Sequence, residues 1–144
     1  MQTEVVQFYV PARELSRWSR PVFTCPVSAG EPLPVVEYID GRIDLNRHLI
    51  KNYAATYFVR VSGDSMTGAG INDGDILVVD RSVEAADGRV VVACVNGEFL
   101  VKRLVERAGR VLLAPENDSY DELEINEHHD FEIWGVVTSV IHSL

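Results

Sequence analysis

The segment from Ser62 to Met66 contains a serine that could act as a nucleophile. Ser65 follows a run of β-forming residues and is flanked by the small or short residues of the sequence SGDSM. A serine at the end of a strand can present its hydroxyl while neighbouring backbone N–H groups face a developing oxyanion. The same position is typical of a serine that only forms a turn. Ser65 is therefore a candidate nucleophile, and the local pattern leaves both roles open.

Lys102 is the candidate base for such a serine. In the run EFLVKRLV at residues 98–105, the two-residue period of a strand places Leu100, Lys102 and Leu104 on one face. Desolvation by the two leucines would lower the pKa of the lysine, and a neutral amine can take a proton from a serine hydroxyl. A strand lysine can equally extend its ammonium group into water. The pattern permits a Ser65–Lys102 dyad without requiring one.

The remaining polar residues have simpler interpretations. His128, His129 and Asp130 lie in a long polar stretch that is typical of a solvated connection. The two other histidines and the two cysteines show no metal-ligand spacing. We therefore expect neither a metal site nor a cofactor.

The elements that must position the candidate residues are mostly strands. Apolar and β-branched runs predict strands at 57–61, 76–79, 90–95, 98–105, 110–114 and 131–141. The pair Asn96-Gly97 supplies the positive φ angles of a type I′ turn and predicts a hairpin that contains Lys102. The predicted fold class is mostly β.

The part of the chain before residue 57 has a weaker pattern. A short strand or helix fits Val5–Val10, and prolines on both sides of Ala29-Gly30 favour an extended linker there. A short helix is expected at Asp44–Ile50, with Asp44 near its N-terminus. We expect this helix to turn Leu45, His48 and Leu49 inward.

Length and charge limit the classes of function. The chain has 144 residues, with 13 basic and 22 acidic side chains and a net charge of −9. One domain with an arm accounts for this length, and its core needs no disulfide. Because negative charge opposes binding to phosphate backbones, a role with DNA would require protein partners. The sequence lacks a signal peptide and an apolar run of about 20 residues, so we expect a cytoplasmic protein with no membrane span.

Several motifs in this order resemble the LexA/UmuD family of self-cleaving Ser-Lys peptidases, most closely its UmuD branch. The resemblance covers most of residues 21–144 and is carried by RIDLN at 42–46, SGDSM at 62–66, GINDGD at 70–75, NGEFLVKRL at 96–104 and WGVV at 134–137. It implies a core of curled antiparallel sheets preceded by an arm. It also implies that Ser65 is the nucleophile and Lys102 its general base.

The resemblance further implies a cleavage site. The family cuts its own chain between a small residue and a glycine, about 35 residues before the serine, and Gly30 lies 35 residues before Ser65. We therefore expect a cut at Ala29-Gly30, between an arm at 1–29 and a catalytic and dimerisation domain at 30–144. UmuD proteins often carry Cys-Gly at this bond, whereas Ala-Gly is found in LexA-type repressors. Residues 1–29 show no helix-turn-helix pattern, which favours the UmuD branch.

The function implied by the resemblance is an accessory role in SOS translesion synthesis. A RecA filament on single-stranded DNA would stimulate autoproteolysis, and the processed homodimer would join UmuC in an error-prone DNA polymerase. Three alternatives stay open at this point. They are a non-enzymatic dimeric regulator of a DNA polymerase, a LexA-like or phage-type cleavable regulator, and a Ser-Lys protease that cuts other proteins as signal peptidase does.

Overall fold

The computed structural model describes residues 1–12, 19–23 and 39–144. The chain forms two compact units, one made of Met1–Pro11 with Asn52–Leu144 and the other of Ala12–Lys51. The predicted boundary at Ala29-Gly30 lies outside the described residues. No helix in the described part of the chain is long and apolar enough to cross a membrane.

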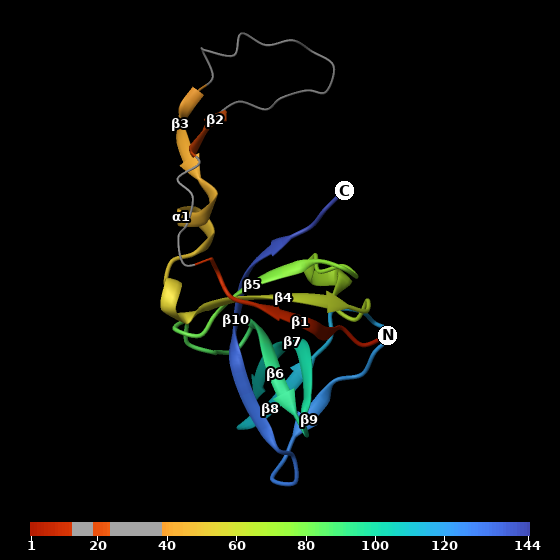
Figure 1. Ribbon diagram of the computed structural model, residues 1–144. Coiled ribbons are helices and arrows are strands. Elements are labelled where there is room, and N and C mark those ends of the chain that lie inside the picture. Colours follow the sequence, from red (N-terminus) through yellow and green to blue (C-terminus); the bar gives the residue numbers. More distant parts are fainter. Residues whose placement is uncertain (13–18, 24–38) are drawn as a thin grey trace. The chain divides into compact units, whose positions relative to one another are not determined.

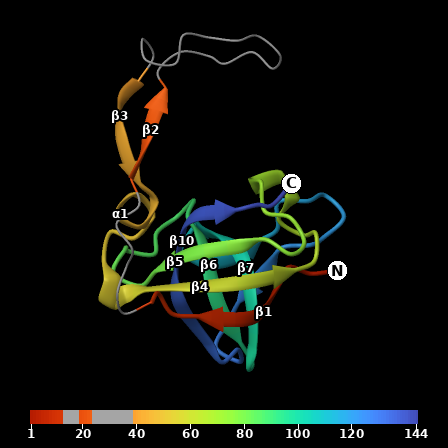
Figure 2. The same cartoon turned by 45° about the horizontal axis from the view of Figure 1, so that its top comes forward.

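The larger unit is an antiparallel sheet of eight strands that curls back on itself. The strand order is β1-β4-β5-β10-β6-β7-β8-β9, and β1 also pairs with β7. Figures 1 and 2 show β1 alongside β4 and the curl of the strands that follow. The strands are β1 (Glu4–Tyr9), β4 (Thr56–Ser62), β5 (Ile76–Asp80), β6 (Val90–Val95), β7 (Glu98–Arg107), β8 (Arg110–Ala114), β9 (Leu123–Ile125) and β10 (Phe131–Ile141). The prediction of a mostly β fold with curled antiparallel sheets is confirmed.

Two apolar clusters hold this sheet together, and β6 contributes to both. Val92 belongs to one cluster, with residues of β4, β5 and β7, whereas Val91 and Ala93 belong to the other, with residues of β7, β8 and β10. Successive side chains of a strand point to opposite faces, so β6 is buried on both sides. Its partner β7, which carries Lys102, is therefore fixed in the middle of the unit.

Most of the strands in this unit follow the sequence pattern. All six strands predicted beyond residue 56 are present, and the early segment Val5–Val10 is a strand rather than a helix. The hairpin at Asn96-Gly97 is also present, with φ angles of 50° and 83° at its two turn residues. Two 3₁₀ turns, η2 (Tyr53–Ala55) and η3 (Thr67–Ala69), flank β4.

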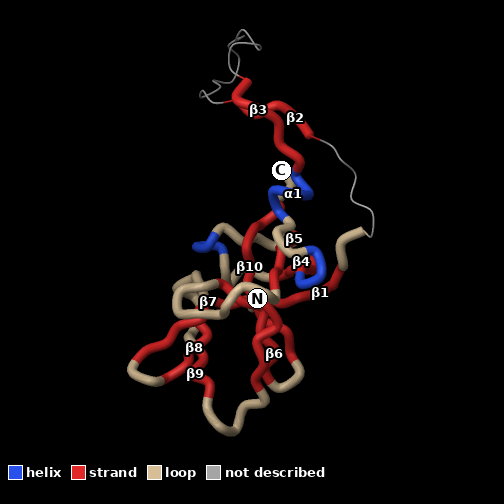
Figure 3. Tube along the Cα trace, turned by 90° about the vertical axis from the view of Figure 1, so that its left-hand side faces the viewer, coloured by secondary structure: helices blue, strands red, loops and turns tan. Residues whose placement is uncertain are grey.

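The smaller unit contains a hairpin that the sequence did not reveal. Strands β2 (Ser19–Phe23) and β3 (Ile39–Asp44) pair in antiparallel fashion, and helix α1 (Leu45–Leu49) follows (Figure 3). Asp44 caps the helix by accepting a hydrogen bond of 3.0 Å from the Asn46 N–H, as its position predicted. The expectation that Leu45 and His48 face inward is wrong, because this helix of five residues buries none of its side chains.

Candidate active site

The loop after β4 places Ser65 in a buried position. Gly63 turns the chain at the end of β4 with a φ of +102°, a conformation that favours glycine. Its N–H donates to the carboxylate of Asp73 at 2.9 Å, and the carbonyl of Ser65 accepts from the N–H of Glu116 at 2.8 Å. The next residue, Met66, is fully buried in the core. These contacts anchor the loop on both sides of Ser65, which has no exposed surface.

Lys102 approaches the serine from the neighbouring strand β7. It is paired with Val91 of β6 and is only 4% exposed, so its amine does not extend into water. The amine Nζ lies 2.7 Å from the Oγ of Ser65. The fold thus brings together two candidate residues that are far apart in the sequence. We call this pair the dyad.

Burial also prepares the amine for a role as a base. Desolvation lowers the pKa of Lys102 from its ordinary value of 10.5 to about 8, against the smaller opposing effect of the Glu4 carboxylate. A buried ammonium loses its hydration, which disfavours the charged form. Near pH 8, about half of the molecules therefore carry a neutral Lys102 amine, which can accept a proton from a hydroxyl within hydrogen-bond reach.

The same burial makes Lys102 costly for stability, and we expect Lys102→Met to stabilise the fold at neutral pH. The unfolded chain binds this proton more tightly than the folded chain, so the penalty is complete below about pH 8 and is relieved as the pH rises toward 10.5. The shift corresponds to about 3 kcal/mol, from which lost hydrogen bonds subtract about 1 kcal/mol. Urea unfolding should show a gain of about 2 kcal/mol at pH 7 that falls to zero near pH 10, above which the lost hydrogen bonds make the variant slightly less stable than the wild type.

The control for this prediction is Lys51→Met, at the other lysine of the chain, which is exposed. That substitution should leave the free energy of unfolding nearly unchanged, as is usual at the surface. A Lys102→Met variant that is less stable than the wild type at pH 7 would contradict the assigned cost of burying the charge.

The polar loop between β8 and β9, residues 115–122, closes one side of the site. The N–H of Gly68 donates to the carbonyl of Glu116 at 2.7 Å, and the side-chain amide of Asn117 donates to the carbonyl of Asp64 at 2.9 Å. Gly68 has no room for a side chain, because a Cβ would lie 2.6 Å from the Glu116 oxygen. Gly68 is a signal of this contact in the sequence. Its meaning becomes clear only once Glu116 is known to lie beside it.

Tyr120, in the same loop, faces the dyad. Its ring centroid lies 5.9 Å from the Lys102 amine, a distance at which an aromatic face attracts a cation. Its hydroxyl hydrogen-bonds the Asp64 carboxylate, which raises the pKa of Tyr120 and lowers that of Asp64. The loop therefore contributes an aromatic surface and a hydroxyl to the edge of the site.

The beginning of the chain also contacts the dyad, and no sequence pattern indicated this. The backbone N–H of Thr3 donates to the Oγ of Ser65 at 2.7 Å. The Lys102 amine donates to the side-chain oxygen of Gln2. Each functional atom of the dyad therefore has a partner from residues 1–3 in addition to the other member of the pair.

The other candidate residues lie elsewhere. His128, His129 and Asp130 are in the connection before β10, with His128 exposed and its backbone held by the Asn126 side chain. The bond Ala29-Gly30 lies outside the described residues. Within the part of the chain that the structure describes, no group of three potential metal ligands occurs.

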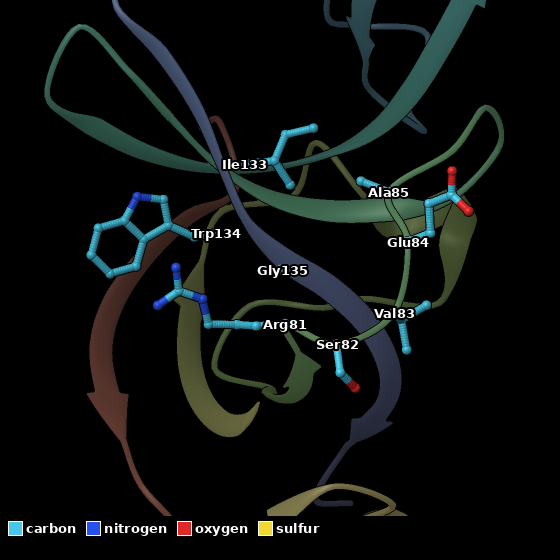
Figure 4. A pocket seen from close by; sticks show the side chains of 8 residues that line it. All are labelled: Arg81, Ser82, Val83, Glu84, Ala85, Ile133, Trp134 and Gly135. Carbon is cyan, nitrogen blue, oxygen red and sulfur yellow. The ribbon is translucent and has the colours of Figure 1, made fainter. Parts of the chain in front are cut away.

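A hollow of about 450 Å³ is lined by residues that do not include the dyad, and Figure 4 shows the side chains of its lining. Residues 81–85 form one wall and residues 133–135 of β10 the other. The guanidinium of Arg81 stacks on the ring of Trp134, with 5.5 Å between its central carbon and the ring centroid. Neither Ser65 nor Lys102 lines this hollow, so it is separate from the dyad.

Comparisons with known proteins agree with the resemblance seen in the sequence. Protein MucA from Salmonella typhimurium is 45% identical over 127 residues, which are 88% of this chain and 84% of MucA. Protein ImpA from Shigella flexneri is 45% identical over 123 residues, 85% of this chain and 83% of ImpA. Protein SamA from Salmonella typhimurium is 41% identical over 132 residues, 92% of this chain and 91% of SamA. The family model described as Peptidase S24-like matches residues 21–138, and the chain belongs to this LexA/UmuD-like family.

Proposed function

We propose that the chain is a serine peptidase that cleaves itself with a Ser-Lys dyad. The observation that carries this proposal is the distance of 2.7 Å between the Ser65 Oγ and the Lys102 Nζ in a site that excludes water from both. A hydroxyl is a weak nucleophile until an adjacent base removes its proton. A desolvated lysine next to the serine is such a base.

The proposed reaction has two steps. In the first, the Ser65 Oγ attacks the carbonyl carbon of Ala29, and Lys102 takes the hydroxyl proton and passes it to the nitrogen of Gly30. The Ala29-Gly30 bond breaks, leaving an ester between Ser65 and Ala29. In the second step, water attacks this ester, Lys102 accepts the water proton and returns a proton to Ser65, and residues 1–29 leave with a free carboxylate.

Membership of the LexA/UmuD-like family supports an accessory role in SOS mutagenesis. We propose that a RecA filament on single-stranded DNA stimulates the cut and that the processed homodimer joins a UmuC-type subunit of a translesion polymerase. The net charge of −9 supports action through protein partners, because it opposes direct binding to a phosphate backbone. The proposal of these partners is supported by the family relationship.

Incubation of the purified chain at pH 10, followed by mass spectrometry, tests the peptidase. We expect a fragment that begins at Gly30, together with the released residues 1–29, and neither product from Ser65→Ala. A chain that stays intact at pH 10 and also in the presence of RecA filaments would overturn the proposal. That result would favour a non-enzymatic regulator.

A further inference from the structure

We propose that Met1–Thr3 form an inhibitor segment that occupies the space between the Ser65 loop and β7, which we call the catalytic groove, and that must leave before the Ala29-Gly30 bond can enter. The inference rests on the proposed function and concerns the regulation of that same site. The groove is suited to bind an extended peptide, and in this structure it binds residues 1–3 of its own chain.

The backbone of the segment is held as an added strand. The carbonyl of Met1 accepts from the N–H of Asp64 at 2.9 Å, and the carbonyl of Thr3 accepts from the N–H of Val101 at 3.2 Å. Directly after the segment, Glu4 is opposite Ser62 on β4 and also opposite Leu100 on β7. The segment therefore lies between the Ser65 loop and β7, where an extended peptide binds by adding a strand to an existing sheet.

The contacts with the dyad are those of an inhibitor. Attack on a peptide requires a carbonyl carbon in front of the Ser65 Oγ, but this position holds the Thr3 N–H, a hydrogen-bond donor, at 2.7 Å. The N–H engages an oxygen lone pair that would otherwise attack. The Gln2 side chain accepts a hydrogen bond from the Lys102 amine at the same time. With Thr3 and Ser65 both fully buried, a second peptide cannot reach the hydroxyl.

The groove is shaped for this close approach. A Cβ on Gly63 would lie 2.1 Å from the carbonyl oxygen of Gln2, so only glycine lets the segment pass at this depth. Further along, Phe8 of β1 packs against the rings of Phe99 and Trp134, with centroid distances of 5.0 Å and 6.1 Å. The aromatic contacts and the pairing with β4 hold β1 in place, and β1 in turn holds the segment on the dyad.

One feature of the segment favours its release. Among the described residues, the buried hydroxyl of Thr3 is a polar side-chain atom without a hydrogen-bond partner. Burial of an unpaired hydroxyl carries a desolvation penalty, so the segment binds less tightly than it would with an apolar residue of the same shape at position 3. Such a balance suits a segment that must be displaced when cleavage is triggered.

The lysine content of the chain provides a test that does not depend on self-cleavage. Lys102 and the exposed Lys51 are the two lysines, so Lys51 is an internal reference. A brief pulse of acetic anhydride at pH 8, followed by mass spectrometry of peptides, gives the ratio of acetylation at the two sites. We expect Gln2→Ala and Thr3→Pro, which each remove one contact with the dyad, to raise this ratio roughly tenfold, the factor for one hydrogen bond that involves a charged group.

Two further variants fix the interpretation. Gln7→Ala is the matched control, because Gln7 lies on β1 with an exposed side chain bonded to Tyr9 and should leave the ratio unchanged. Thr3→Val keeps the shape of the residue and removes the unpaired hydroxyl, so the segment should bind more tightly. The acetylation ratio of Lys102 to Lys51 should then fall several-fold. A synthetic peptide of residues 1–9, added to the Gln2→Ala chain, should restore protection of Lys102.

Self-cleavage rates measured on the same proteins separate the possible outcomes. A rise in both acetylation and cleavage of Gln2→Ala and Thr3→Pro, with Gln7→Ala unchanged, supports the inhibitor segment. An unchanged acetylation ratio in both variants overturns it, as does higher acetylation with no gain in the cleavage rate. Higher acetylation in a chain that never cleaves supports occupation of the groove and overturns the proposed peptidase.

Discussion

Self-cleavage of the Lys102→Arg variant is expected to be about a thousandfold slower than that of the wild-type chain. The guanidinium group keeps the positive charge but stays protonated at every accessible pH, so it cannot take the proton of Ser65. A positioned general base contributes typically 10²–10⁴-fold to a rate. The measurement is a time course at pH 9, in which mass spectrometry follows the fragment that begins at Gly30.

Variants with other side chains show whether charge or packing causes the loss. Arginine is larger than the lysine it replaces in a site that is 4% exposed, so Lys102→Met, which fits the same space, should show the same loss with an intact fold. Lys51→Arg makes the same exchange at an exposed position and should cleave at the wild-type rate. Rates of Lys102→Arg and Lys102→Met within a few-fold of the wild type would exclude Lys102 as the base.

The parts of the fold that the sequence predicted are those with a local pattern. Asn96-Gly97 specifies its own turn geometry, and the run Val90–Val95 is long and apolar enough to indicate a strand buried on both faces. The alternation around Lys102 placed it on a face with leucines, and the structure buries it there. Proximity of Ser65 and Lys102 followed from the motifs of the family resemblance, since neither local pattern alone required it.

The parts that the sequence did not predict depend on contacts between distant residues. Thr3 and Ser65 are 62 positions apart and Gln2 and Lys102 are 100 apart, so no window of the sequence contains both partners. Strand β9 (Leu123–Ile125) has three residues within a polar stretch and exists because it pairs with β8. The prediction for the helix at Leu45 was wrong for a different reason. Its spacing suggested a buried face, but five residues form too short a helix to bury one.

The cost of the buried lysine and its proposed role have the same physical origin. An amine that stayed in water would keep a pKa near 10.5 and would be charged at neutral pH, stable but inert as a base. The fold instead excludes water from Lys102, and the resulting loss of stability is what makes a neutral amine available. Lys102→Met is therefore expected both to stabilise the fold and to remove the cleavage activity.

The cleavage rate should rise about tenfold per pH unit up to about pH 8 and then level off. Only the neutral amine accepts a proton, and with a pKa of about 8 the neutral fraction of Lys102 is about 1% at pH 6 and about 90% at pH 9. Initial rates from pH 6 to 11, with Ser65→Ala as the blank, should therefore span about a hundredfold. A profile that continues to rise through pH 10 would mean that the amine is hydrated in the reacting state.

The inhibitor segment gives this profile a second use. Burial is the main cause of the low pKa, and the Gln2 side chain contacts the buried Lys102 amine. The Gln2→Ala variant should therefore cleave faster at high pH while its inflection moves above 8, because water reaches the amine and stabilises the charged form. The Gln7→Ala chain should keep the wild-type inflection. An inflection that stays at 8 in Gln2→Ala would show that the fold around β7, without help from the segment, sets the pKa of the base.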